Sequence, residues 1–158
     1  MGFFSRLFRW DDHATPAARA PDAPPSEMGL DAATARAVLA ELDIDSAINA
    51  HENWKNRLLA VMEGRSDEQL DPAVVCLDDR CDLGRWLHGK GRECLGRYPA
   101  FSVLVARHQL FHREASAVLS LAQAGEQAKA DQKLQSGYRH ASNQVVLLLK
   151  ELKRGLGR

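Results

Sequence analysis

Two histidines set four residues apart place their imidazoles on one face of a helix, one turn apart, where both can bind the same ion. His108 and His112 have this spacing. The same helix face carries apolar side chains, so the pair is expected to point into the protein interior; these are Leu104, Val105, Phe111 and Ala115. A buried polar pair needs partners, and a metal ion is one that would satisfy both rings at once.

A third histidine, His51, lies on another apolar helical stripe. Its companions at helical spacing are Ile44, Ile48, Trp54 and Leu58. A single inward histidine is more often a hydrogen-bonded core residue than a ligand. A pair in register together with a third on another helix favours a metal site over that alternative.

A cysteine is the natural fourth ligand, and the chain has three. Cys81 stands at the expected start of a short helix, where the helix dipole favours a thiolate. One Cys with three His suits tetrahedral Zn²⁺. Cys76 follows an apolar pair and is expected in the core, whereas Cys94 is expected in a polar turn. The residues favour Cys81, although periodicity alone does not select it.

The composition predicts the kind of protein that would hold this site. Among the 158 residues, 44 are Ala or Leu and only 13 are Val, Ile or Thr, a balance typical of helices. The length fits one domain and excludes a large multidomain enzyme. Basic and acidic residues number 21 each, which gives no indication of nucleic-acid binding. The longest apolar runs, such as Val145–Leu149, have five residues, too few for a membrane span. Three Cys without a secretory signal indicate the cytoplasm.

The first 27 residues differ from the rest and are predicted to be a disordered extension. Met1–Trp10 is a short amphipathic segment with aromatic residues and two arginines, and Asp11–Glu27 is a linker with four prolines. The start could dock on a partner or on a membrane surface. Folding back on the domain is the alternative, and the residues do not decide between them.

Residues 28–158 are predicted to form an all-α domain, an antiparallel four-helix bundle with short extra helices. Its expected long elements end near glycines, as at Gly64 and Gly125. The expected helices are Ala32–Leu42, Asp45–Glu63, a short one from Ser66 through Asp71 and Pro72 to Val75, Cys81–Gly91, Ala100–Ala124 and Glu126–Lys153.

Three short motifs follow one another along the chain. They are His51-Glu52-Asn53-Trp54, then Cys81-Asp82-Leu83-Gly84-Arg85-Trp86-Leu87, then His108-Gln109-Leu110-Phe111-His112. The intervals are 30 residues from His51 to Cys81 and 27 from Cys81 to His108. This arrangement resembles the chemoreceptor zinc-binding (CZB) domain family, whose pattern is H-x-x-W, C-x-L-G-x-W-L and H-x-x-x-H. Each motif is weak alone, but the three in order are specific.

The resemblance implies a cytoplasmic, dimeric helical sensor with a core of about residues 44–154, usually attached to chemotaxis receptors or diguanylate cyclases. The implied zinc ligands are His51, Cys81, His108 and His112. Members of this family sense zinc or oxidants, hypochlorous acid in particular, at the zinc-bound cysteine.

Other motif residues are expected to support the site. Trp54 and Trp86 would pack around the metal site, and their indole N–H groups, once buried, would need hydrogen-bond acceptors. Gly84 would permit a close approach between elements. Asp82, with its neighbours Asp78 and Asp79, belongs either to a solvated loop or to a contact with an imidazole.

These observations predict a regulatory module, not an enzyme. The chain has no room for a methyl-accepting coiled coil or a cyclase domain, so its signal is expected to leave through a partner of the chemotaxis or cyclic-di-GMP pathways, with Met1–Trp10 as the candidate contact. A structural zinc adaptor needs the same ligands and remains the alternative. A di-iron bundle would need bridging carboxylates that the other histidines lack at i+4, and a zinc hydrolase would need an open coordination position.

Overall fold

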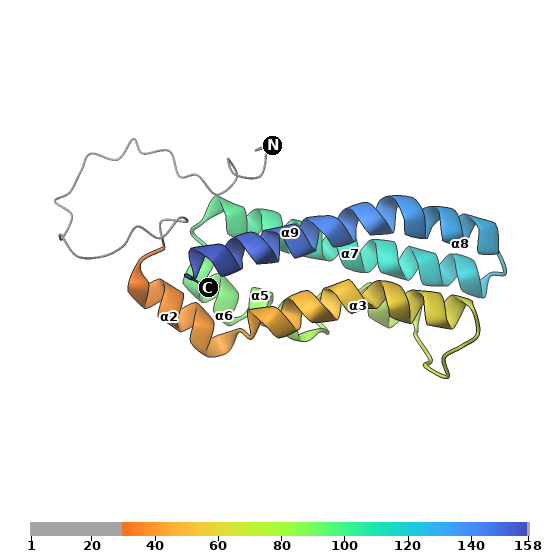
Figure 1. The fold of residues 1–158 in the computed structure, drawn as a ribbon, viewed down its shortest axis with the longest axis horizontal. Coiled ribbons are helices and arrows are strands. Elements are labelled where there is room, and N and C mark those ends of the chain that lie inside the picture. The colour runs from red at the N-terminus through yellow and green to blue at the C-terminus, as the bar shows by residue number, and fades with distance from the viewer. Residues whose placement is uncertain (1–29, 158) are drawn as a thin grey trace.

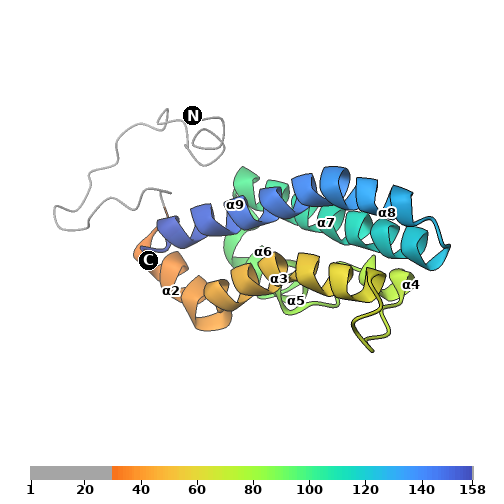
Figure 2. The same cartoon turned by 45° about the vertical axis from the view of Figure 1, so that its right-hand side comes forward.

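The computed structural model describes residues 30–157, and within them every regular element is helical. The predicted disordered extension, residues 1–27, lies outside the described residues. Figures 1 and 2 show the helices, which are α2 (Ala32–Glu41), α3 (Ile44–Met62), α4 (Pro72–Val75, labelled in Figure 2), α5 (Asp82–His88), α6 (Lys90–Leu95), α7 (Pro99–Gln123), α8 (Gln127–Lys133), the π-helical turn η1 (Leu134–Tyr138) and α9 (Arg139–Gly155). The predicted all-α class is confirmed.

Three long helical segments lie side by side, and the chain reverses its direction after each leg of its path. Helices α3 and α7 run the same way, and α8, η1 and α9 return antiparallel to both (Figures 1 and 2). Between α3 and α7 the chain travels back through the short helices α4, α5 and α6. The second leg of the path is therefore a series of short helices instead of one long one.

The composition of that second leg explains why it is broken. Pro72 and Pro99 lack the N–H that a helix interior needs, and the glycines between them lower helix propensity. Those glycines are Gly84, Gly89, Gly91 and Gly96. The predicted single helix Cys81–Gly91 is wrong for the same reason: α5 ends at His88, and Gly89, whose backbone is neither helical nor extended, separates it from α6.

Side-chain capping sets where the helices begin. The Asp43 carboxylate accepts a hydrogen bond from the Ser46 N–H and starts α3. The prediction of a helix from Ser66 is wrong, because residues 65–71 are not helical. The short helix starts at Pro72, where Asp71 accepts from the Ala73 N–H and proline suits the first helical position.

The two remaining cysteines also differ from expectation. Cys76, predicted in the core, is half-buried at the end of α4, where its Sγ donates to the Ala73 carbonyl. Cys94, predicted in a polar turn, lies in α6 and packs half-buried against the core.

The last predicted helix, Glu126–Lys153, is one continuous helical run that contains the π turn η1. In a π turn the backbone hydrogen bonds span five residues instead of the four of an α-helix, which widens the helix locally. A Cβ added to Gly137 in this turn would lie 2.1 Å from the Glu114 Oε2, so the absent side chain leaves space for that carboxylate. Helix α7 thereby approaches the π turn closely, and Lys133 pairs with Glu114 at 2.9 Å.

The apolar faces of the long helices meet in one core. Leu58 of α3, Phe111 of α7 and Leu149 of α9 are fully buried in it. Within the described residues, the buried polar side chains are three histidines: His51, His108 and His112. None of the helices in residues 30–157 is long and apolar enough to cross a membrane.

Candidate metal centre

Helix α7 contributes two imidazoles that face one another. The Nε2 atoms of His108 and His112 lie 3.2 Å apart. The Nδ1–H of His112 donates to the carbonyl oxygen of Val75, at 2.8 Å, across from the end of α4. This hydrogen bond places the proton on Nδ1 and leaves the Nε2 lone pair of His112 directed toward the shared space.

Helix α3 contributes the third imidazole, His51, which is also oriented by a hydrogen bond from its Nδ1–H to a backbone carbonyl. The Nδ1–H of His51 donates to the Ala47 carbonyl oxygen, one turn earlier, at 2.7 Å. Its Nε2 is buried and has no hydrogen-bond partner among residues 30–157. A buried acceptor without a partner is costly unless another group occupies the space in front of it.

Among the residues that the structure describes, Cys81 is the one cysteine whose sulfur lies in this space. It is the N-cap of α5, and its Sγ accepts a hydrogen bond from the Gly84 N–H at 3.2 Å. The same Sγ lies 3.3 Å from the Nε2 of His108 and 3.6 Å from that of His112. The sulfur is therefore packed among the imidazole nitrogens.

The four side chains fit one tetrahedral ion. His51, Cys81, His108 and His112 each offer a ligand atom, and these atoms all lie within 4.8 Å of one another. Zinc bonds of about 2.0–2.3 Å separate neighbouring ligand atoms by roughly 3.3–3.8 Å. The three distances among Cys81, His108 and His112, 3.2 to 3.6 Å, are close to that range. The unpartnered Nε2 of His51 supplies the remaining corner.

Burial shifts the protonation of the three imidazoles toward metal binding. Desolvation lowers the pKa of His51 to about 4 and that of His108 to about 2, and the neighbouring imidazoles add to both shifts. Desolvation also lowers the pKa of His112. All three rings are thus neutral at pH 7, the form that binds metal. Burial raises the pKa of the Cys81 thiol, so a nearby cation would be needed to keep the thiolate.

Gly84 permits the close approach that was expected of it, but the neighbour is a loop and not a helix. A Cβ added there would lie only 1.7 Å from the Asp78 carbonyl oxygen. The absence of a side chain lets the first turn of α5 pack directly on the loop before Cys81, which places the thiol next to α7.

The two motif tryptophans make different contacts beside the groove that both line. Trp54 is half-buried, meets His112 edge-on with centroids 6.4 Å apart, and has the Arg57 guanidinium 4.1 Å above its ring. Trp86 is buried and contacts Phe101 edge-on. Within the part of the chain that the structure describes, the Trp86 indole N–H has no hydrogen-bond partner, so the expected bond is not seen there.

Among the aspartates beside Cys81, the structure brings Asp78 to the site. The Asp82 side chain is 98% exposed and forms an ion pair with Arg85. The Asp78 carboxylate instead lies 3.7 Å from the Nδ1 of His108 and accepts a hydrogen bond from the Nε2–H of His88 at 2.8 Å. Sequence reasoning missed His88, although its position four residues after Gly84 places it on the same face of α5.

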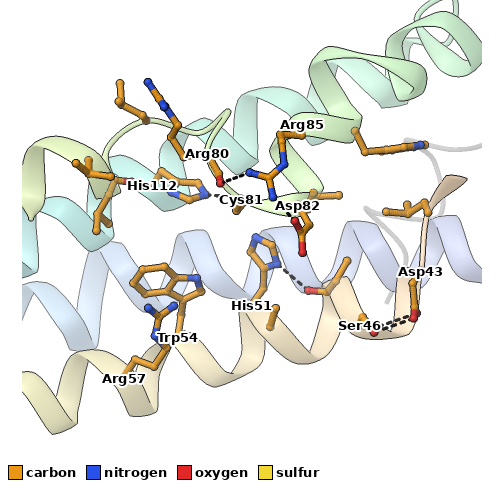
Figure 3. A pocket seen from close by; sticks show the side chains of 18 of the residues that line it. Asp43, Ser46, His51, Trp54, Arg57, Arg80, Cys81, Asp82, Arg85 and His112 are labelled. Atoms are coloured by element: carbon orange, nitrogen blue, oxygen red, sulfur yellow. Dashed lines mark hydrogen bonds and ion pairs between the residues drawn. The ribbon is translucent and has the colours of Figure 1, made fainter. Parts of the chain in front are cut away.

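One side of the centre opens to a groove of about 670 Å³ between α3 and the α4–α5 region. His51, Cys81 and His112 line it together with Trp54 (Figure 3). Charged residues, Arg80 and Asp82 among them, stand around it. Small solutes can therefore approach the sulfur from this side.

Comparison with known protein families gives one match. The chemoreceptor zinc-binding domain family matches residues 51–119, a span that begins at His51 and contains the other three candidate ligands. Neither a curated protein nor a solved structure matches the chain. The ordered motifs, the converging ligand atoms and the family match agree, and residues 51–119 of this chain are similar to the chemoreceptor zinc-binding domain family.

Proposed function

We propose that the protein is a zinc-binding sensory module in which His51, Cys81, His108 and His112 hold the ion. The convergence of their four ligand atoms in a buried space is the observation that carries the proposal. Bound zinc would keep Cys81 as a thiolate and join α3, α5 and α7. The up-and-down path supports an antiparallel four-helix bundle whose second leg is formed by α4, α5 and α6.

Cys81 is the proposed point at which an oxidant acts. Its thiolate sulfur takes the oxygen of hypochlorous acid and becomes a sulfenic acid as chloride leaves, a two-electron oxidation of sulfur. The groove that Cys81 lines supports access of such a small oxidant. A sulfenic acid is a poorer ligand than a thiolate, so α5 would lose its attachment to α7. Zinc depletion would have the same consequence.

We place the module in the cytoplasm, as a homodimer whose change in shape is read by a chemoreceptor or a cyclic-di-GMP enzyme. The family match supports this kind of pathway. Met1–Trp10 is the proposed contact with the partner or with a membrane surface. Nothing in the balanced charge supports nucleic acid as the partner.

Metal analysis of the purified protein tests the centre. We expect about one zinc per chain in the wild type and loss of zinc, or a large drop in affinity, in Cys81→Ala. Cys76→Ala and Cys94→Ala are matched controls, because both thiols lie outside the cluster, and they should keep the ion. Full zinc affinity in Cys81→Ala would refute the ligand assignment.

Hydrogen exchange tests the sensing role separately. We expect amides of α5 to exchange faster after zinc removal or after stoichiometric hypochlorous acid, while α9 stays protected. Cys81→Ala should show no further change with the oxidant. If hydrogen exchange and partner binding are the same in the zinc-bound, zinc-free and oxidised wild type, the zinc is structural. The buried four-ligand set, with no open position, would then mark an adaptor.

A further inference from the structure

A carboxylate lies between two imidazoles on the side of the centre away from the groove. The Asp78 Oδ2 accepts from the His88 Nε2–H at 2.8 Å and lies 3.7 Å from the His108 Nδ1. His108 is fully buried, whereas the side chains of Asp78 and His88 are 19% and 32% exposed. The three groups form a row from the surface to the metal centre.

Asp78 lies near the Nδ1 of His108, which among the described residues lacks the hydrogen-bond acceptor that the other two histidines have. A backbone carbonyl accepts the Nδ1–H of His51 and another accepts that of His112. The Nδ1 of His108 is buried and has no hydrogen-bond partner within the described residues. A metal-binding histidine commonly donates this N–H to a carboxylate or carbonyl, which sets its tautomer and orientation. The Asp78 carboxylate is the acceptor nearest to that role.

The position of Asp78 is held by α5 at both ends. At its start, Gly84 packs on the Asp78 carbonyl oxygen so tightly that no side chain fits between them. At its end, His88 holds the Asp78 carboxylate. Helix α5 also begins at Cys81, so the element that brings the sulfur is the one that places the carboxylate beside His108.

We propose that Asp78 and His88 are positioning residues for the metal centre: Asp78 orients His108, and His88 acts through Asp78 by holding its carboxylate. The inference rests on the proposed zinc site and deepens it. It gives His88, which none of the family motifs contains, a part in zinc affinity. It also makes the approach of Cys81 and the orientation of His108 depend on the same helix.

The test is a zinc competition titration of the full chain against a chelator of known affinity. Asp78→Asn should raise the zinc Kd by about 10- to 100-fold, the usual cost of losing such a partner of a ligand. His88→Leu should raise it less, and His88→Gln, which keeps an N–H donor, should recover part of the loss. Asp79→Asn and His140→Gln are matched controls at exposed positions and should leave the Kd unchanged.

The double variant distinguishes positioning from a general loss of stability. Because His88 acts through Asp78, Asp78→Asn/His88→Leu should have the Kd of Asp78→Asn alone, whereas independent structural effects would add. In Co²⁺-loaded protein, Asp78→Asn should shift the d–d bands while the thiolate-to-metal band persists. That shift reports the ligand geometry and not the stability of the fold.

Two results would overturn the inference. A zinc Kd for Asp78→Asn within about twofold of the wild type, with an unchanged Co²⁺ spectrum, would show that the carboxylate does not orient His108. Additive losses in the double variant would show that His88 does not act through Asp78. Failure of the proposed function has a different signature: wild-type protein that binds no zinc refutes the centre itself and this inference with it.

Discussion

Three neutral imidazoles in an apolar core are costly to protonate, and this fixes how the metal-free protein responds to acid. Burial lowers the pKa of His51 to about 4 and that of His108 to about 2. In the unfolded chain both titrate near the ordinary value of about 6.5. As the pH falls below about 6.5, the unfolded state takes up protons that the folded state does not, so stability is lost.

We therefore expect the free energy of unfolding of the metal-free protein to be highest above about pH 6.5 and to fall toward pH 4. The slope is up to about 1.4 kcal/mol per pH unit for each of these histidines. Urea unfolding in the presence of a chelator between pH 7.5 and 5 measures it. His51→Phe should reduce the slope, while His140→Gln, at an exposed position, should keep it. A flat profile in the wild type would contradict the neutral buried rings.

Residue patterns predicted this cluster better than they predicted its surroundings. The i, i+4 pair and the apolar stripes indicated that His51, His108 and His112 point inward, and all three are buried. The structure brings Cys81 to them, whereas their role as ligands stays a prediction. Asp78 could not be chosen over Asp82 from the sequence, because the direction of a carboxylate in a loop depends on what packs against that loop.

At the scale of the element, α5 has more effect on the site than its seven residues suggest. It starts with the cysteine, packs its first turn on the preceding loop through Gly84, and ends with His88. The sequence motif from Cys81 to Leu87 thus corresponds to one short helix, which packs on the loop that precedes it.

Gly84→Ala tests this packing directly. The added Cβ would meet a backbone carbonyl at 1.7 Å, which cannot move aside as a side chain end could. We expect a net loss of about 1–3 kcal/mol in unfolding free energy, because the clash with the backbone outweighs the roughly 1 kcal/mol that alanine gains in helix propensity. Urea unfolding of the metal-free protein measures the loss, and a zinc titration should show weaker binding.

Lys90→Ala is the control for that substitution, because it removes only an exposed side chain at the start of α6. It should change the unfolding free energy by no more than about 0.5 kcal/mol. If Gly84→Ala were as stable as this control and bound zinc as tightly, the close approach to Asp78 would have no importance for the site.

For the whole molecule, the four candidate ligands come from three parts of the chain that are far apart in the sequence. His51 comes from α3, Cys81 from the broken second leg, and His108 and His112 from α7. Helix α9 supplies no ligand, but it packs against both α3 and α7. The four candidate ligands and the described core all lie within residues 30–157.

Deletion of residues 1–27 is accordingly expected to leave the zinc content and the thermal unfolding midpoint unchanged, because all four candidate ligands are kept. Capture of the signalling partner should fall if Met1–Trp10 makes the contact. Metal analysis, a thermal scan and a partner binding assay on the truncated protein check these outcomes together. Loss of zinc on truncation would instead show that the segment is part of the fold.

By itself, the sequence determined the helical class, the inward stripes and the family, because helix periodicity and motif spacing are local properties of the chain. It determined the long helices to within a few residues and failed in the second leg, where prolines and glycines leave several short elements equally compatible with the pattern. The tertiary structure brings Cys81 to the histidines, as the motifs implied, and it alone decided which aspartate reaches His108 and that His88 holds it. Those choices depend on how α5 packs on its loop and on α7, a long-range contact that no local pattern encodes.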